Sequence, residues 1–313
     1  MDALADLLDG VRARSAAFCR AVLEPPWALR IADGAMLALA TSLRGHAWIV
    51  PDDDAEPVLM RTGDVAIIKG PQPYTVGDRP DTPPSLIVHP GNRLTTMDGV
   101  DVTADLQLGP RTSGHSQDGS AVVASGTYQV TGDVGGRLLT ALPAVVLVPR
   151  EDAQLPVLDL LAVEVGREEP GQQVVLDRLL DLTLIATLRA WFARPDAEAP
   201  GWYRAQSDSL VGPALRLIHD DPAHPWTVAS LATKVGGSRA AFARRFTALV
   251  GEPPMTYLTG WRITLAADLL RHTDATVDTV ARKVGYANAF ALSVAFKRAR
   301  GVTPRQHRAD RPA

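Results

Sequence analysis

Two short stretches of this sequence each contain three cationic side chains. Their members are Arg239, Arg244 and Arg245 in the first stretch, and Lys297, Arg298 and Arg300 in the second. A guanidinium group can hydrogen-bond a base edge or a phosphate, and an ammonium group binds phosphate as a point charge. We expect the second set to contact phosphates, with a solvated basic helix face as the alternative.

The charge of the chain is distributed unevenly. Residues 201–313 hold 16 Lys and Arg against 8 Asp and Glu, a net charge of about +8. Because the whole chain has a net charge of −3, the first 200 residues carry about −11. A basic C-terminal third is what a module that binds polyanions requires.

Both cationic stretches lie in an internal repeat. The residues that recur 49 positions later are Val228, Ala232, Lys234, Val235 and Gly236, as Val277, Ala281, Lys283, Val284 and Gly285. Those that recur 50 positions later are Phe246, Gly251 and Pro254, as Phe296, Gly301 and Pro304. One residue has therefore been inserted in the turn of the second copy.

Each copy has the helix-ending and helix-capping residues of a helix-turn-helix motif. An apolar helix stops at Gly236 or Gly285, and Ser238 or Asn288 can cap the next helix. The second helix of such a pair enters the major groove of DNA. We expect Arg245 either to share this contact or to pair across the domain surface. The predicted contact residues are Ser238, Arg239, Arg244, Arg245, Asn288, Ala289, Ser293, Lys297, Arg298 and Arg300.

The elements around the repeat divide the chain. Short apolar runs between Gly, Pro and Asp clusters from about 34 to 149 predict an all-β sandwich or barrel. Residues 172–192 carry two apolar stripes at helical spacing, which are Val175, Leu179, Leu182 and Ala186, and then Leu176, Leu180, Leu184, Leu188 and Trp191. One stripe can pack against the β-domain. We favour a dimer contact for the other stripe, and the alternative is that it packs against a neighbouring helix of the same chain.

Beyond an aperiodic stretch near 194–206, seven helical patterns follow without a strand signal. The long pattern at 255–271 can hold the two repeat copies apart, so that both face one side of a duplex.

Residues from about 215 to 308 resemble the DNA-binding domain of AraC/XylS-type bacterial transcription regulators, above all in VGYANAFALSVAFKRARGVTPRQHR. The resemblance implies two helix-turn-helix units, a linker helix, control of promoters and an N-terminal domain that dimerises or senses a ligand. Double-stranded DNA, a second copy of the chain and RNA polymerase are then the expected partners. Val294 stands where the family often has Arg. We therefore expect the first unit to select the DNA sequence and the second mainly to bind the phosphate backbone.

The N-terminal half is similar to the cupin-type sensor domains of such regulators, in PPWALRIADG, LRGHAWIV and RTGDVAIIKGPQPYTV. This likeness implies a small β-barrel. A metal-binding cupin needs several His ligands with a carboxylate. His46 stands without a neighbouring His, and Tyr74 occupies the place where the second motif usually ends in His. We expect no metal or other cofactor, and an unidentified effector in an apolar pocket lined by Trp27, Trp48 or Tyr74.

The sequence thus predicts an α+β chain that is a regulator and not an enzyme. Its expected segments are a cupin-like barrel sensor domain at 1–170, a helical dimerisation segment at 171–193, a linker at 194–206 and an AraC-type DNA-binding domain at 207–313 with two helix-turn-helix motifs. The alternative is a metal-dependent cupin-type enzyme fused to a DNA-binding domain. A DNA-repair methyl acceptor is disfavoured, because that chemistry usually adds a cysteine-rich zinc site and Cys19 is the sole cysteine.

No apolar run is long enough to span a membrane, and the start of the chain, with its acidic residues, does not look like a secretory signal. We expect the protein to stay in the cytoplasm.

Overall fold

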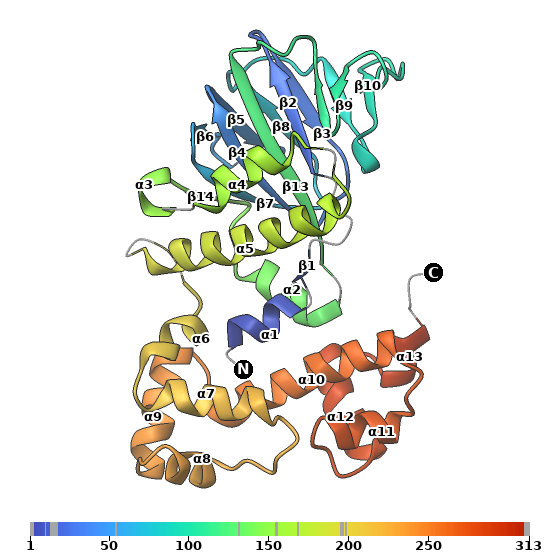
Figure 1. Ribbon diagram of the computed structural model, residues 1–313. Helices are drawn as coiled ribbons and strands as arrows, with labels where there is room; N and C mark the ends of the chain where they lie inside the picture. Colours follow the sequence, from blue (N-terminus) through green and yellow to red (C-terminus); the bar gives the residue numbers. More distant parts are fainter. Residues whose placement is uncertain are drawn as a thin grey trace. The chain divides into compact units, whose positions relative to one another are not determined.

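The protein folds into two compact units in the computed structural model (Figure 1). The structure describes residues 3–9, 11–12, 18–53, 55–130, 132–153, 156–167, 169–194, 197 and 199–309. One unit, here called the sheet unit, is built from residues 11–130 and 142–197. The other, the helical unit, combines residues 199–309 with 3–9 and 132–141. The expected division into a β-rich and an α-helical part is confirmed.

The sheet unit contains two sheets and the helices that follow them. Its strands are β1 Val11–Arg12, β2 Cys19–Leu23, β3 Ala28–Ile31, β4 Leu37–Arg44, β5 His46–Pro51, β6 Val58–Arg61, β7 Val65–Lys69, β8 Tyr74–Gly77, β9 Leu86–Val88, β10 Leu94–Thr96, β11 Gln107–Gly109, β12 Thr112–Gly114, β13 Ala121–Val130 and β14 Val145–Val148. Its helices are η1 Pro90–Asn92, α3 Arg150–Ala153, α4 Val157–Glu164 and α5 Gln172–Ala193.

The two sheets are open. One has the order β11-β12-β2-β13-β4-β7-β14, with β1 beside β13, and the other has the order β10-β9-β3-β8-β5-β6. Closing a barrel requires the outer strands to pair with one another. In the described residues the ends of these two sheets do not, so the expected β-barrel is wrong and the sandwich-like alternative holds.

The core of the sheet unit lies between the sheets. Ala38 and Ile68 come from the first sheet, Ile49 and Met60 from the second, and all four are buried in one cluster. In β5, Ala47 and Ile49 are buried, because alternate residues of a strand point to the same face.

Helix α5 covers a second face of the first sheet. Its buried residues include Leu176, Leu180 and Leu184. The Tyr128 hydroxyl of β13 donates a hydrogen bond of 2.7 Å to the Leu180 carbonyl. A side chain at Gly126 would lie 2.8 Å from Leu180, so glycine permits this close approach of helix and strand.

The helical unit includes helices from the N-terminal half of the sequence. Its helices are α1 Ala3–Asp9, α2 Gly132–Thr140, α6 Gly201–Arg204, η2 Ala205–Ser207, α7 Val211–Asp220, α8 Val228–Lys234, α9 Arg239–Val250, α10 Pro254–His272, α11 Val277–Lys283, α12 Ala289–Arg300 and α13 Pro304–Ala309. Each of the seven helical patterns expected beyond residue 206 corresponds to one of these helices, α7 to α13. The end of the stretch expected as a linker, 201–206, is helical instead.

Helix α10 serves two apolar cores in succession. Its first half buries Tyr257 and Trp261, and Tyr257 packs edge-on against Phe246 of α9. Its second half buries Ile263 and Leu270 in a cluster with residues of α11 and α12. Its 19 residues extend about 28 Å at 1.5 Å per residue. In the described residues, no helix is long and apolar enough to cross a membrane.

Candidate nucleic-acid interface and cavity

The pairs α8–α9 and α11–α12 make the same turn. The Gly237 N–H donates to the Ala232 carbonyl at 2.8 Å, and the Tyr286 N–H donates to the Ala281 carbonyl at 2.8 Å. Each turn contains a glycine at positive φ, 75° in Gly236 and 84° in Gly285. This is the left-handed helix end that favours glycine.

The second helix of each pair begins at a polar cap. The Ser238 hydroxyl accepts from the Ala241 N–H at 3.3 Å, and the Asn288 side chain accepts from the Ala291 N–H at 2.9 Å. Both expected caps are therefore confirmed. The inserted residue lies before Asn288 and leaves the helix start unchanged.

The cationic residues of α9 have different surroundings. Arg239 and Arg244 are exposed, and within the described part of the chain Arg244 has no hydrogen bond or ion pair. Arg245 instead donates to the Asp208 carboxylate at 2.7 Å. That hydrogen bond is the main reason why the pKa of Asp208 is lowered to about 2. Arg245 thus pairs across the domain surface, the alternative that the sequence left open.

On α12, the expected contact residues also separate. Ala289 donates its N–H to Asp278 at 3.3 Å, and Ser293 donates its hydroxyl to the Ala289 carbonyl at 2.7 Å. Lys297 and Arg298 are exposed. The exposed cationic surface of α12 therefore lies in its last turn.

Arg300 is exposed and forms an ion pair within the helical unit. Its guanidinium donates to Asp133 of α2 at 2.8 Å, and Arg271 and His307 lie 3.8 and 3.6 Å from the same carboxylate. Burial, first of all, lowers the pKa of His307. Arg300, which we expect at phosphates, thus forms an ion pair with an acid 167 positions away in the sequence.

Helix α2 is also fixed at its start. The Asp268 carboxylate of α10 accepts the N–H groups of Asp133 and Val134, the latter at 3.0 Å. Nearby, His219 of α7 lies 2.6 Å from Asp6 of α1 and 2.8 Å from the Tyr257 hydroxyl. Charged contacts therefore attach α1 and α2 to the helices beyond residue 206.

Sequence reasoning missed one prominent residue. Phe290 of α12 is 79% exposed and Val294 is 54% exposed. Four residues apart, they lie on one face of the helix, opposite the buried Leu292 and Phe296. The signal was present in the sequence, since Phe290 does not fit the spacing of the core residues.

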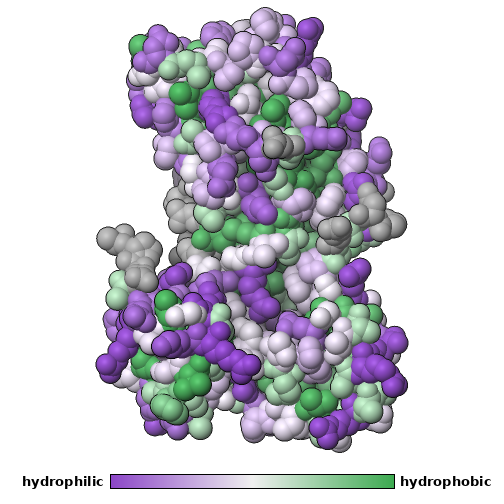
Figure 2. All heavy atoms as spheres, turned by 180° about the vertical axis from the view of Figure 1, so that it is seen from behind, coloured by the Kyte–Doolittle hydropathy of each residue, from purple (hydrophilic) through white to green (hydrophobic). Residues whose placement is uncertain are grey.

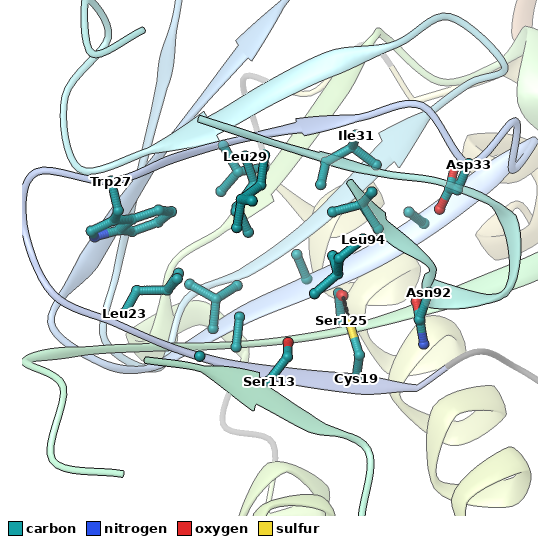
Figure 3. Close-up of a pocket in the computed structure, with 18 of the residues that line it drawn as sticks. Cys19, Leu23, Trp27, Leu29, Ile31, Asp33, Asn92, Leu94, Ser113 and Ser125 are labelled. Carbon is teal, nitrogen blue, oxygen red and sulfur yellow. Dashed lines mark hydrogen bonds between the residues drawn. The ribbon is translucent and has the colours of Figure 1, made fainter. Parts of the chain in front are cut away.

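The sheet unit encloses an apolar cavity of about 90 Å³ between its sheets. Figure 3 places Trp27 and Leu23 toward one end, and Asp33 and Asn92 toward the other. The Cys19 thiol lies 3.1 Å from the Ser125 hydroxyl, and burial raises the pKa of Cys19. One end of the cavity is therefore apolar, whereas polar groups gather toward the other.

Of the three aromatic residues expected at a pocket, Trp27 and Tyr74 line this cavity. Burial raises the pKa of Tyr74, so its hydroxyl stays protonated. Trp48 is not among the lining residues. It alternates along β5 with the buried Ala47 and Ile49, so its side chain points to the opposite face.

The histidines of the sheet unit are hydrogen-bonded or line the cavity. His46 lies 3.2 Å from the Asp78 carbonyl, His89 lies 2.9 Å from the Thr95 hydroxyl, and His115 contributes to the cavity wall. Among the described residues, no three His, Cys, Asp or Glu side chains gather closely enough to hold a metal ion.

Comparisons with known proteins cover both units. Residues 2–193 match the family model described as Cupin, and residues 231–310 match that described as Helix-turn-helix domain. An AraC-like transcription regulator of Streptomyces lividans is 31% identical over 98% of each chain. The transcriptional regulator AlkR of Acinetobacter baylyi is 28% identical over 98% of this chain and 99% of its own. The DNA-binding domain of AdpA, solved with a target DNA, is 33% identical over 33% of this chain and 92% of that one, with a TM-score of 0.32.

Proposed function

This chain belongs to the AraC-like transcription regulators, and on that premise we propose that it binds promoter DNA as a dimer under the control of a small molecule. The observation that carries the DNA-binding part is the repeated, capped turn, which in both copies leaves one face of the second helix exposed. We therefore assign α8–α9 and α11–α12 as two helix-turn-helix units, here the first and second unit.

The residues proposed to meet DNA are fewer than the sequence suggested. Arg239 and Arg244 serve the first unit, and Lys297 and Arg298 serve the second. The starts of α9 and α12 are held by Ser238, Asn288, Ala289 and Ser293. The backbone N–H groups at these helix starts would lie near phosphates. Arg245 and Arg300 are left out, because their guanidinium groups already donate hydrogen bonds to Asp208 and Asp133.

Dimerisation is proposed through α4 and α5. Their exposed apolar residues are Leu160, Val163, Val174, Val175 and Leu182, between 44% and 61% exposed. Several exposed apolar residues on two neighbouring helices are typical of a protein interface. Val175 and Leu182 belong to the stripe of α5 for which the sequence analysis favours a dimer contact.

An effector is proposed in the cavity of the sheet unit. Leu29, Val88 and Leu94 would contact its apolar body, and Asp33 and Asn92 would bind a polar end. A carboxylate beside the polar end favours a ligand that donates hydrogen bonds or carries a positive charge. A screen of small amines, alcohols and acids by their effect on Tm tests this. Hits should be amines or alcohols, and Ala40→Phe, which fills the cavity, should remove their effect.

A regulatory role without catalysis is proposed, because the relatives named above are regulators. Its place of action would be the cytoplasm, where RNA polymerase is a further partner.

The deciding experiment is a binding-site selection from random duplexes with the full-length protein. A shared sequence motif with two separated blocks is expected. Equal binding to all duplexes would overturn the assignment of two DNA-reading units.

A further inference from the structure

The second unit exposes an apolar ridge, defined as Phe290 and Val294 of α12. Among the described residues, Phe290 is the most exposed large hydrophobic side chain. Keeping a phenyl ring in water is unfavourable. The exposed position of Phe290 on α12 therefore indicates that a binding partner covers the ring. On the face of the helical unit that Figure 2 presents, hydrophobic side chains form small patches among hydrophilic ones.

The ridge lies on the face of α12 that takes no part in the core. Phe290, Val294 and Lys297 are spaced i, i+4 and i+7, so they form one stripe along the helix. Leu292 and Phe296, both 0% exposed, lie on the opposite side. The ridge also occupies the first half of α12, the part of a recognition helix that meets base edges.

The first unit presents different chemistry at the same places. Ala240 and Arg244 of α9 lie 50 positions before Phe290 and Val294, and both are exposed. A guanidinium group can pair with guanine, whereas phenyl and isopropyl groups cannot donate or accept a hydrogen bond. The two units therefore cannot recognise the same feature of a base pair.

In the major groove, the apolar group on a base edge is the C5 methyl of thymine. Lys297 continues the ridge and Lys283 of α11 is also exposed, and their positive charges favour the DNA backbone around those bases. We propose that the second unit reads sequence by packing Phe290 and Val294 against thymine methyl groups. This inference rests on the proposed DNA binding and revises the expectation that the second unit mainly grips phosphates.

The test uses the full-length protein and the operator recovered by selection. Each thymine is replaced in turn by deoxyuridine, which removes the methyl group and leaves the hydrogen-bonding edge unchanged. Burial of one methylene-sized group is worth about 0.8 kcal/mol, so each contacted methyl should change affinity about fourfold. We expect this loss at one or two thymines in the block bound by the second unit.

Matched variants assign the effect to the ridge. In Phe290→Ala or Val294→Ala, the deoxyuridine penalty should disappear, whereas Arg244→Ala should retain it. Phe290→Leu, which stays apolar, should retain most of it. Because both ridge residues are exposed, Tm should stay close to that of the wild type and report that the variants fold.

The outcomes separate this inference from the proposed function. If the protein selects a sequence but no thymine is sensitive to deoxyuridine, methyl reading is overturned and DNA binding stands. If it selects no sequence, both fall. If Phe290→Ala binds the operator normally but fails to support transcription by purified RNA polymerase, the ridge binds protein instead, which also overturns the inference.

Discussion

At the scale of single residues, the proposed function assigns Arg244, an exposed guanidinium without an ion pair among the described residues, to a base. A bidentate contact to guanine discriminates by about 1–3 kcal/mol, so Arg244→Ala should cost that much on the selected operator and relax one base position. Competition binding with operator variants measures both effects. Arg216→Ala removes an exposed arginine of α7 and serves as the control. Equal weakening on every sequence would assign Arg244 to phosphate instead.

Lys297 should behave differently, because an ammonium group on phosphate carries no sequence information. Lys297→Ala is expected to weaken all duplexes alike and to reduce the slope of log K against log salt by about one. A salt titration of operator and random DNA checks this. An altered selected sequence in this variant would contradict the assignment.

Arg245 is expected to contribute to stability through its ion pair with Asp208. The pKa of Asp208 is 3.8 before folding and about 2 in the folded protein, so its ionised form stabilises the fold above pH 4. This stabilisation is lost as the pH falls from about 4 to about 2. Arg245→Ala should therefore be less stable than wild type at pH 7, with the difference narrowing toward pH 2. Urea unfolding at several pH values measures it; a constant difference would exclude the ion pair as its cause.

At the scale of elements, the outer face of α5 should hold the dimer together. Leu182→Asp puts a charge into an apolar contact, so ultracentrifugation should find the mass falling from about twice 33.4 kDa to one chain. Val100→Asp is the control, since Val100 is 58% exposed but lies outside α4 and α5. A monomeric wild type, or dissociation in both variants, would rule out this interface.

The start of α2 depends on Asp268 of α10. Losing a group that caps a helix costs about 1 kcal/mol, so Asp268→Ala should lower the free energy of unfolding by that amount. Asp268→Asn keeps one accepting oxygen and should lose less. Chemical denaturation of the three proteins gives the answer; equal losses in both variants would point to charge rather than to capping.

The elements also divide into those that the sequence could predict and those that it could not. Turns at Gly236 and Gly285 and caps at Ser238 and Asn288 are local, so the helices of the repeat were predictable. Whether a sheet closes is decided by pairing between distant strands, and barrel and sandwich have the same local pattern. The ion pairs of Arg245 and Arg300 involve residues 37 and 167 positions away, so no local pattern in the sequence could predict them.

At the scale of the whole molecule, the helical unit is incomplete without α1 and α2. A chain of residues 199–313 alone would leave His219 without Asp6, and Asp268 without the start of α2. We expect this fragment to melt below the full chain and to bind the operator more weakly. Leu182→Asp in the full chain separates the causes, because it removes avidity and leaves α1 and α2 in place. A fragment as stable as the full chain would make these contacts unimportant.

The membership of α1 and α2 in the helical unit limits how such regulators can be recombined. A hybrid made by joining the sensor of one relative to the DNA-binding part of another, at one junction near residue 197, would bring foreign α1 and α2 to the native α10. The contacts of Asp6, Asp133 and Asp268 would then join residues that come from two different parent proteins. Exchange of the whole sensor by a single crossover is therefore disfavoured. A working hybrid would have to take the three segments of the helical unit, which contain α1, α2 and the helices beyond residue 198, from the same parent.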